Sequence, residues 1–98
     1  MNKWNDVKNF VNSHDIFTRK ELKKESLSDN TVDNYINYII KAGFIDRIGR
    51  GKYKLLIKIP KYISSSIIFV LAYNEEKRTK LMTSLIRKQK LENIGGSL

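Results

Sequence analysis

The sequence predicts an α+β fold that is mainly α-helical. Two segments, residues 2–13 and 28–42, carry apolar side chains at the three- and four-residue spacing of amphipathic helices. Later in the chain, two strand-like segments flank a glycine-rich turn at residues 49–52, the pattern of a β-hairpin. With 98 residues, of which 41% are hydrophobic, the chain has enough apolar material for one core and little for a second.

The first helix is expected over residues 2–13. Its apolar side chains share one face and are Trp4, Val7, Phe10 and Val11. The polar residues 13–15 end it, and residues 15–17 follow as a brief extended segment. Trp4 is therefore expected in the core, not on a platform that stacks nucleic-acid bases.

The second helix starts with a capping box, the sequence TRKE of residues 18–21. The hydroxyl of Thr18 can accept from the backbone N–H three residues on, while Glu21 reaches back to the Thr18 N–H. The helix is expected to run to about Glu25, anchored by Leu22.

The third helix has the clearest periodicity in the chain. Ser28 is its expected N-cap, and Asp29 suits the positive end of the helix dipole. One face collects the apolar side chains, which are Val32, Tyr35, Ile36, Ile39 and Ile40. Gly43 is expected to end the helix in the left-handed conformation.

Two strands are expected at residues 44–48 and 53–59, joined by the turn at 49–52 and closed by Pro60. The turn is not a nucleotide-binding loop. A P-loop needs Ser or Thr after its Gly-Lys pair and a helix beyond it, whereas Tyr53 and a strand follow Lys52. The glycines instead permit the backbone of a tight turn.

Residues 67–73, IIFVLAY, leave helix and strand both open. The serines at 64–66 are able to cap a helix, but β-branched and aromatic residues favour a strand. From Asn74 the pattern is helical again. We therefore expect three parts: a domain at residues 1–60, a C-terminal helical extension at 61–94, and a flexible tail at 95–98.

The segment FTRKELKKESLSDNTVDNYINYIIKAGFIDRIGRGKYKL, residues 17–55, resembles the winged helix-turn-helix DNA-binding superfamily. Its T-x-x-E-L second helix, S-x-x-T-V third-helix start, GFI exit and GRGKY turn carry the likeness, which spans roughly residues 2–60. The resemblance implies three helices plus a two- or three-stranded β-wing. It also implies that the third helix enters the major groove of DNA.

Charge favours an anionic partner. The net charge is +9, and it is concentrated in residues 46–98, where twelve Lys and Arg face four acids. Residues 1–45 are nearly balanced, with seven against six. A basic surface also serves solubility alone, but an excess confined to one half argues for a binding surface.

The third helix carries the candidate base-reading residues on the face opposite its apolar stripe and at its shoulders. They are Asn30, Thr31, Asn34, Asn37, Tyr38 and Lys41. Asparagine offers a donor and an acceptor that match adenine, and lysine reaches guanine or a phosphate. The alternative is that these asparagines are merely solvated. Asp29 and Asp33 count against a helix lying in the groove, since phosphates repel carboxylates.

Two further sets of residues are candidates for DNA backbone contacts. In the fold that the sequence resembles, the start of the second helix approaches phosphates, which makes Thr18, Arg19 and Lys20 candidates. The wing presents Arg47, Arg50 and Lys52, which suit phosphates or a narrow minor groove. A solvated basic face is the alternative for both sets.

No catalytic constellation is found, and neither a cofactor nor a metal is expected. Cysteine is absent, and the single histidine, His14, lies in a turn beside one acid. The longest apolar run, residues 67–73, is too short to span a membrane. With no apolar segment resembling a signal peptide near the first residue, a cytoplasmic protein is expected.

These features predict a non-enzymatic double-stranded-DNA-binding protein, a small transcriptional regulator that forms a homodimer through residues 61–94. The alternative to the dimer is that residues 67–73 pack back on the first helix and the chain stays monomeric. By analogy, such regulators are common on mobile genetic elements. The alternative is an interaction module or accessory subunit of a replication or recombination machine. That role would involve a larger protein partner and non-specific or single-stranded binding.

Overall fold

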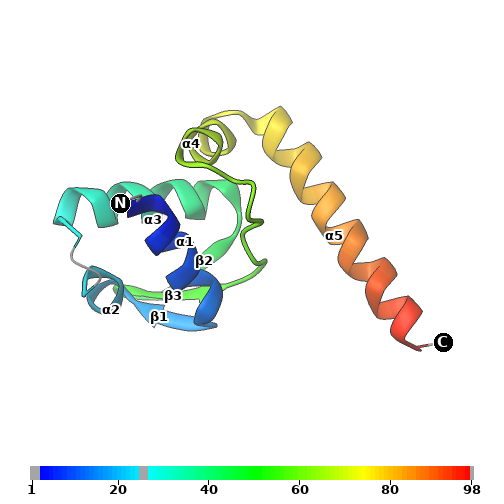
Figure 1. Cartoon of the computed structure of the whole chain (residues 1–98), viewed down its shortest axis with the longest axis horizontal. Coiled ribbons are helices and arrows are strands. Elements are labelled where there is room, and N and C mark those ends of the chain that lie inside the picture. The colour runs from blue at the N-terminus through cyan, green and yellow to red at the C-terminus, as the bar shows by residue number, and fades with distance from the viewer. Residues whose placement is uncertain (1–2, 25–26, 98) are drawn as a thin grey trace.

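The computed structural model describes the backbone of residues 3–24 and 27–97 and the side chains of residues 3–24 and 27–87. Expectations for residues 2, 25 and 98 lie outside these ranges. The elements, in order, are α1 Lys3–Ser13, β1 Ile16–Thr18, α2 Arg19–Lys23, α3 Asp29–Ala42, β2 Ile45–Gly49, β3 Lys52–Leu55, α4 Ser65–Tyr73 and α5 Glu75–Ser97 (Figure 1). The α+β winged-helix fold predicted from the sequence is confirmed.

The helix ends follow the predicted capping chemistry. The Thr18 hydroxyl accepts from the Glu21 N–H at 3.1 Å, and Glu21 accepts from the Thr18 N–H at 3.1 Å, which completes the capping box. Ser28 accepts from the Thr31 N–H at the start of α3. Gly43 ends α3 at a φ of 93°, a conformation that glycine adopts without steric cost.

The sheet has three antiparallel strands in the order β1-β3-β2, with Phe17 opposite Tyr53. β3 ends at Leu55, so the strand predicted over residues 53–59 is too long. The reason lies in the hydrogen bonds. The N–H groups of Leu56 and Ile57 both donate to the Phe44 carbonyl, which draws the chain out of the ladder. A register shift between Arg47 and Gly49 bends the wing near its tip.

The core lies where α1, α3 and the sheet meet. Its largest fully buried side chains come from both halves of the chain: Trp4, Phe17, Phe44, Leu22, Ile39, Ile45, Ile63 and Ile68. Burial of each such Leu, Ile or Phe side chain stabilises the fold by about 1.5–3 kcal/mol. Trp4 is in the core as expected, with its ring centroid 5.2 Å from that of Tyr35.

Polar side chains of α1 fasten the connection between β3 and α4. Trp4 Nε1 donates to the Ile63 carbonyl at 2.7 Å. The ammonium of Lys8, a buried residue, donates to the carbonyls of Lys61 at 2.8 Å and Ile63 at 3.2 Å. These bonds could not be predicted from the sequence, because their partners lie more than fifty positions apart. They bring residues 61–63 into the same body as the first helix.

Residues 67–73, left open between helix and strand, belong to helix α4. Ser64 caps it by accepting from the Ile67 N–H at 3.2 Å. Ile68 and Leu71, spaced for one helical face, are buried in the common core, and α4 packs along α3. Tertiary packing on α3 thus outweighs the strand propensity of the segment.

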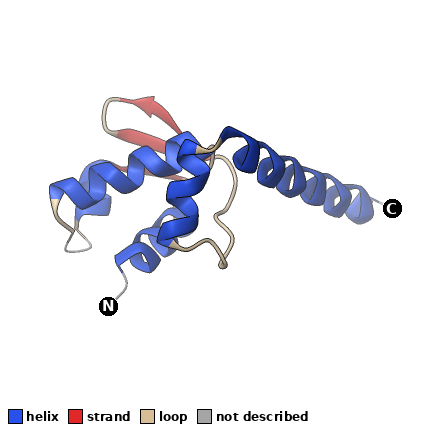
Figure 2. Ribbon diagram, turned by 90° about the horizontal axis from the view of Figure 1, so that it is seen from above, coloured by secondary structure: helices blue, strands red, loops and turns tan. Residues whose placement is uncertain are grey.

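α5 leads away from the rest of the fold, as Figures 1 and 2 both show. Asn74 caps its start by accepting from the Lys77 N–H at 3.0 Å. Leu81, Met82 and Leu85 are half-buried against the core. α5 extends to Ser97, into the segment 95–98 expected as a tail, and the flexibility of that segment stays a prediction. No described helix combines the length and apolar character needed to cross a lipid bilayer.

Candidate nucleic-acid interface

α3 presents one continuous polar surface, which we call the reading face. It consists of Asn30, Asn34, Asn37 and Lys41, and all four residues are exposed. At 100° per residue these positions share one side of the helix, opposite buried Val32, Ile36 and Ile39. Burial of the apolar stripe therefore fixes which side of α3 is available to a partner.

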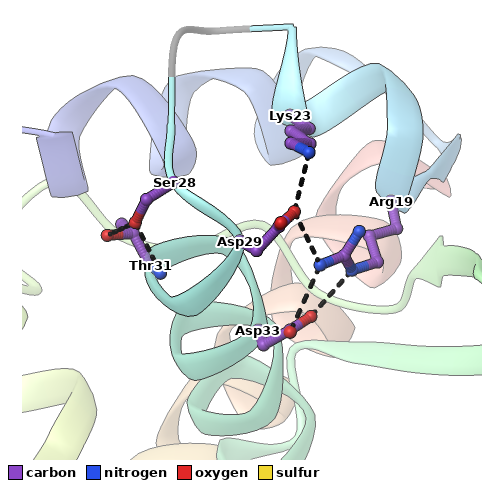
Figure 3. A network of polar contacts seen from close by, with 6 residues as sticks. All are labelled: Arg19, Lys23, Ser28, Asp29, Thr31 and Asp33. Carbon is purple, nitrogen blue, oxygen red and sulfur yellow. Dashed lines mark hydrogen bonds and ion pairs between the residues drawn. The ribbon is translucent and has the colours of Figure 1, made fainter.

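Thr31 is part of the N-cap of α3. It is half-buried, its N–H donates to the Ser28 hydroxyl at 3.2 Å, and its own hydroxyl lies 2.8 Å from that same oxygen (Figure 3). The hydroxyl is thus partly occupied within the helix start. This restricts Thr31 to contacts that leave the cap intact.

On one shoulder of the reading face, four charged side chains join α2 to the start of α3. We call this group, Arg19, Lys23, Asp29 and Asp33, the α2–α3 bridge (Figure 3). Arg19 donates from Nε to Asp33 Oδ1 at 2.7 Å and from one Nη to Asp33 Oδ2 at 3.2 Å. The same Nη reaches Asp29 Oδ1 at 3.2 Å, and Lys23 Nζ lies 2.8 Å from that oxygen.

The contacts of the α2–α3 bridge shift the pKa values of Arg19, Asp29 and Asp33. Its hydrogen bond to Asp33 raises the pKa of the Arg19 guanidinium above its usual range. The pKa of Asp33 is lowered chiefly by the hydrogen bond from Arg19. The pKa of Asp29 is lowered first by the hydrogen bond from Lys23 and then by that from Arg19. Both carboxylates are therefore ionised at neutral pH, and each has a cation beside it.

On the other shoulder, aromatic side chains join α3 to α4. Tyr38 is half-buried, and its ring meets those of Phe69 and Tyr73 edge-on, with centroids 5.4 and 6.0 Å away. The Lys41 ammonium lies 4.5 Å from the centroid of the Tyr73 ring, within the range of a cation–π contact. Tyr38 and Lys41 thus have partners within the chain, which the sequence did not indicate.

The wing tip lies against the start of α2. The Arg19 N–H donates to the Gly51 carbonyl at 2.9 Å, and Thr18 pairs with Lys52 across the sheet. Arg50, Lys52 and Lys20 are exposed. The structure therefore brings the predicted α2 and wing candidates into one neighbourhood.

Arg47 turns back on its own strand. Its Nε donates to the Gly49 carbonyl at 3.3 Å, while its backbone N–H donates to the Asp46 carboxylate at 2.9 Å. Gly51, at a φ of 66°, permits the tight turn beside Arg50. All three predicted wing residues are exposed, but Arg47 makes a side-chain bond within its own strand, whereas Arg50 and Lys52 flank the turn.

Sequence reasoning missed the partners of Arg19 and the aromatic residues of α4. Asp29 and Asp33 are four residues apart, so they lie on one side of α3, a signal that they share a cation. Among the described residues no group of three acidic or histidine side chains is placed to hold a metal ion. His14 lies 2.8 Å from the Phe10 carbonyl and stacks on the Phe10 ring.

By fold, this is a winged-helix protein. The chain belongs to the family described as "Transcriptional regulator, AbiEi antitoxin", whose model matches residues 5–55. Membership makes it a DNA-binding regulator at that level of description. Comparison with curated proteins and with solved structures gives no match.

Proposed function

We propose that the protein is a non-enzymatic transcriptional regulator that inserts α3 into the major groove of double-stranded DNA. The observation that carries the proposal is the reading face, with three asparagines and a lysine in one exposed row. Asparagine is a mediocre helix former, so three on one face call for a role. The amide matches the adjacent acceptor and donor of adenine in the major groove.

The two shoulders limit how α3 enters the groove. α4 lies along α3, and its rings cover the flank at Tyr38. We therefore assign base contacts chiefly to Asn30, Asn34 and Asn37, in keeping with recognition helices that read through their N-terminal part. Lys41, held near Tyr73, is assigned to a phosphate. Tyr38 serves as packing at the groove edge. Thr31 supports the cap at Ser28, and its hydroxyl can also donate to a phosphate.

Backbone contacts come from the start of α2 and from the wing. Thr18, Lys20, Arg50 and Lys52 lie on adjoining elements, joined by the bond between the Arg19 N–H and the Gly51 carbonyl. Arg47 is assigned a supporting contact from the wing strand. Contacts of this kind add affinity and salt dependence for any sequence. A wing arginine also suits the narrow minor groove of A·T-rich DNA.

We further propose a homodimer formed through residues 61–94. α4 leaves several large apolar side chains 37–55% exposed, namely Ile67, Phe69, Val70 and Tyr73. Such a surface supports association with a second apolar face. A two-fold dimer would present two copies of α3 to two half-sites.

Selection of bound duplexes from a random library, followed by binding measurements on the selected site, tests the assignment. Asn34→Ala and Asn37→Ala should each reduce the preference for that site over random duplex by about 1–3 kcal/mol. Arg50→Ala should weaken binding to both duplexes and lower the slope of log K against log salt by about 0.9.

If the two asparagine variants bind like the wild type while Arg50→Ala abolishes binding, α3 does not read the sequence. Steep salt dependence without any site preference would instead support the accessory-subunit alternative.

A further inference from the structure

Arg19 connects the three elements to which the proposed function assigns DNA contacts. Its backbone N–H holds the wing tip through the Gly51 carbonyl at 2.9 Å. Its side chain holds α3 through Asp33 and Asp29. Arg19 itself is the first residue of α2. One residue thus joins the wing, the second helix and the reading helix.

The α2 helix needs such a connection. Within its five residues, all of them described, Leu22 alone is buried. The bond from the Arg19 N–H to Gly51 holds the start of α2 against the wing, but it does not tie the helix to α3. The guanidinium engages both oxygens of Asp33, and this fork-like geometry fixes direction as well as distance. The α2–α3 bridge therefore supplies a directional attachment of α2 to α3, in addition to the buried Leu22.

The same bonds withdraw Arg19 from the DNA backbone. Two of its guanidinium nitrogens are committed to carboxylates, and its side chain is only 34% exposed. The four charges of the α2–α3 bridge sum to zero, so this shoulder offers a phosphate no net attraction. Lys20, the next residue along α2, is exposed.

We propose that Arg19 is a positioning residue, which holds α3 and the wing in one fixed frame, and not a phosphate ligand. The inference rests on the proposed function, because it concerns how the reading face is presented to bases. A positioning residue affects discrimination between sequences, whereas a phosphate ligand affects affinity for all sequences alike.

Arg19→Lys separates the two roles without changing the charge. Lysine is a single point charge that can still bind a phosphate but cannot bridge both oxygens of Asp33 and reach Asp29 together. We expect binding to a random-sequence 30-base-pair duplex to keep its affinity and salt slope. The preference for the selected site should fall about fivefold or more. A fivefold loss is about the smallest loss of discrimination expected when one bidentate base contact is lost.

Two further variants complete the test. Arg19→Met with Asp33→Asn removes the bridge to Asp33 without changing net charge and leaves Asp29 beside Lys23. It should also keep the salt slope and lose site preference. Lys20→Met is the matched control on the same helix, expected to lower the slope by about 0.9 while keeping the preference. Thermal unfolding verifies that each variant is folded. We expect the variants to fold, because the side chains of the α2–α3 bridge are at least one-third exposed.

The inference is overturned if Arg19→Lys keeps the site preference, or if the Arg19→Met, Asp33→Asn variant loses about 0.9 in slope with its preference intact. Either result would leave the proposed function standing. If selection from the random library enriches no site for the wild type, the proposed function fails, and the inference fails with it.

Discussion

Asn12 and Ile59 exchange two hydrogen bonds, although they lie 47 positions apart. The amide of Asn12 donates to the Ile59 carbonyl at 2.8 Å and accepts from the Ile59 N–H at 2.8 Å. The side chain thus takes the place that a neighbouring strand would fill. This satisfies both backbone groups of Ile59 after the chain has left β3.

Asn12→Ala should therefore destabilise the fold by about 1–3 kcal/mol, because it leaves a partly buried donor and acceptor without partners. Urea unfolding at neutral pH measures the change. Asn9→Ala, at an exposed position of the same helix, is the control and should stay within about 0.5 kcal/mol of the wild type. Equal stability of the two variants would contradict the role of Asn12.

Gly43 and Gly51 both have positive φ, 93° and 66°, but differ in their surroundings. Alanine at either position should cost about 1–2 kcal/mol through backbone strain alone. At Gly43 the new Cβ would also lie 3.3 Å from Met82 Cε, whereas nothing lies within 4 Å at Gly51. Gly43→Ala should thus be the more damaging change in thermal unfolding.

The contact with Met82 is tested by adding Met82→Ala to each glycine variant. Adding Met82→Ala should narrow the difference in melting temperature between Gly43→Ala and Gly51→Ala. The backbone strain that both variants share should remain. If the difference stays the same, the side chain of Met82 is not its cause.

The α2–α3 bridge predicts that the contribution of Asp33 to stability changes with pH only in the acidic range. The folded-state pKa of Asp33 is lowered by Arg19, so its contribution to stability is present above the ordinary carboxylate pKa and is lost as pH falls through the lowered value. The difference in melting temperature between wild type and Asp33→Asn should be constant from about pH 5 to 8 and shrink toward pH 3. A change centred near pH 6–7 would contradict this assignment.

The proposed dimer is testable with a variant that should stabilise helix α4 while it disrupts the exposed apolar face of that helix. Ile67→Glu places a carboxylate three residues after Ser64, which creates a capping box at the start of α4. The helix should be stabilised, while a charge enters the exposed apolar face. Sedimentation should then show a monomer at concentrations where the wild type is dimeric.

Ile16→Glu, at a half-exposed position on β1 outside that face, serves as the control and should leave the dimer intact. A dimer that survives Ile67→Glu, or a wild type that is monomeric at every concentration, would remove this part of the proposal.

Local chemistry predicted much of the fold. The capping box at Thr18, the cap at Ser28 and the ending at Gly43 all depend on residues within four positions of one another. The 3.6-residue period of α3 identified its buried stripe in the same way. Such features are decided within one or two turns of chain, so the sequence suffices to recognise them.

Features that depend on tertiary placement could not be predicted in this way. Residues 67–73 form a helix because α3 offers a surface for Ile68 and Leu71, which no local propensity encodes. The ion pairs of Arg19 with Asp29 and Asp33 depend on α2 and α3 lying side by side, which no local pattern encodes. The exposure of the reading face was predictable from the helical period of α3. The side chains that flank it come from α2 and α4, so they were not predictable from that period.

Because Lys8 and Asn12 bond to residues 59–63, the segment that packs as one body is longer than the segment that matches the family model. The family match ends at residue 55, before any of the carbonyls that these side chains bind. A fragment that ends there would leave the buried ammonium of Lys8 without its carbonyl partners. It would also expose the side of α3 that packs against α4. Anyone excising the DNA-binding part for crystallisation or fusion should therefore keep the chain through Tyr73, where α4 closes over the core.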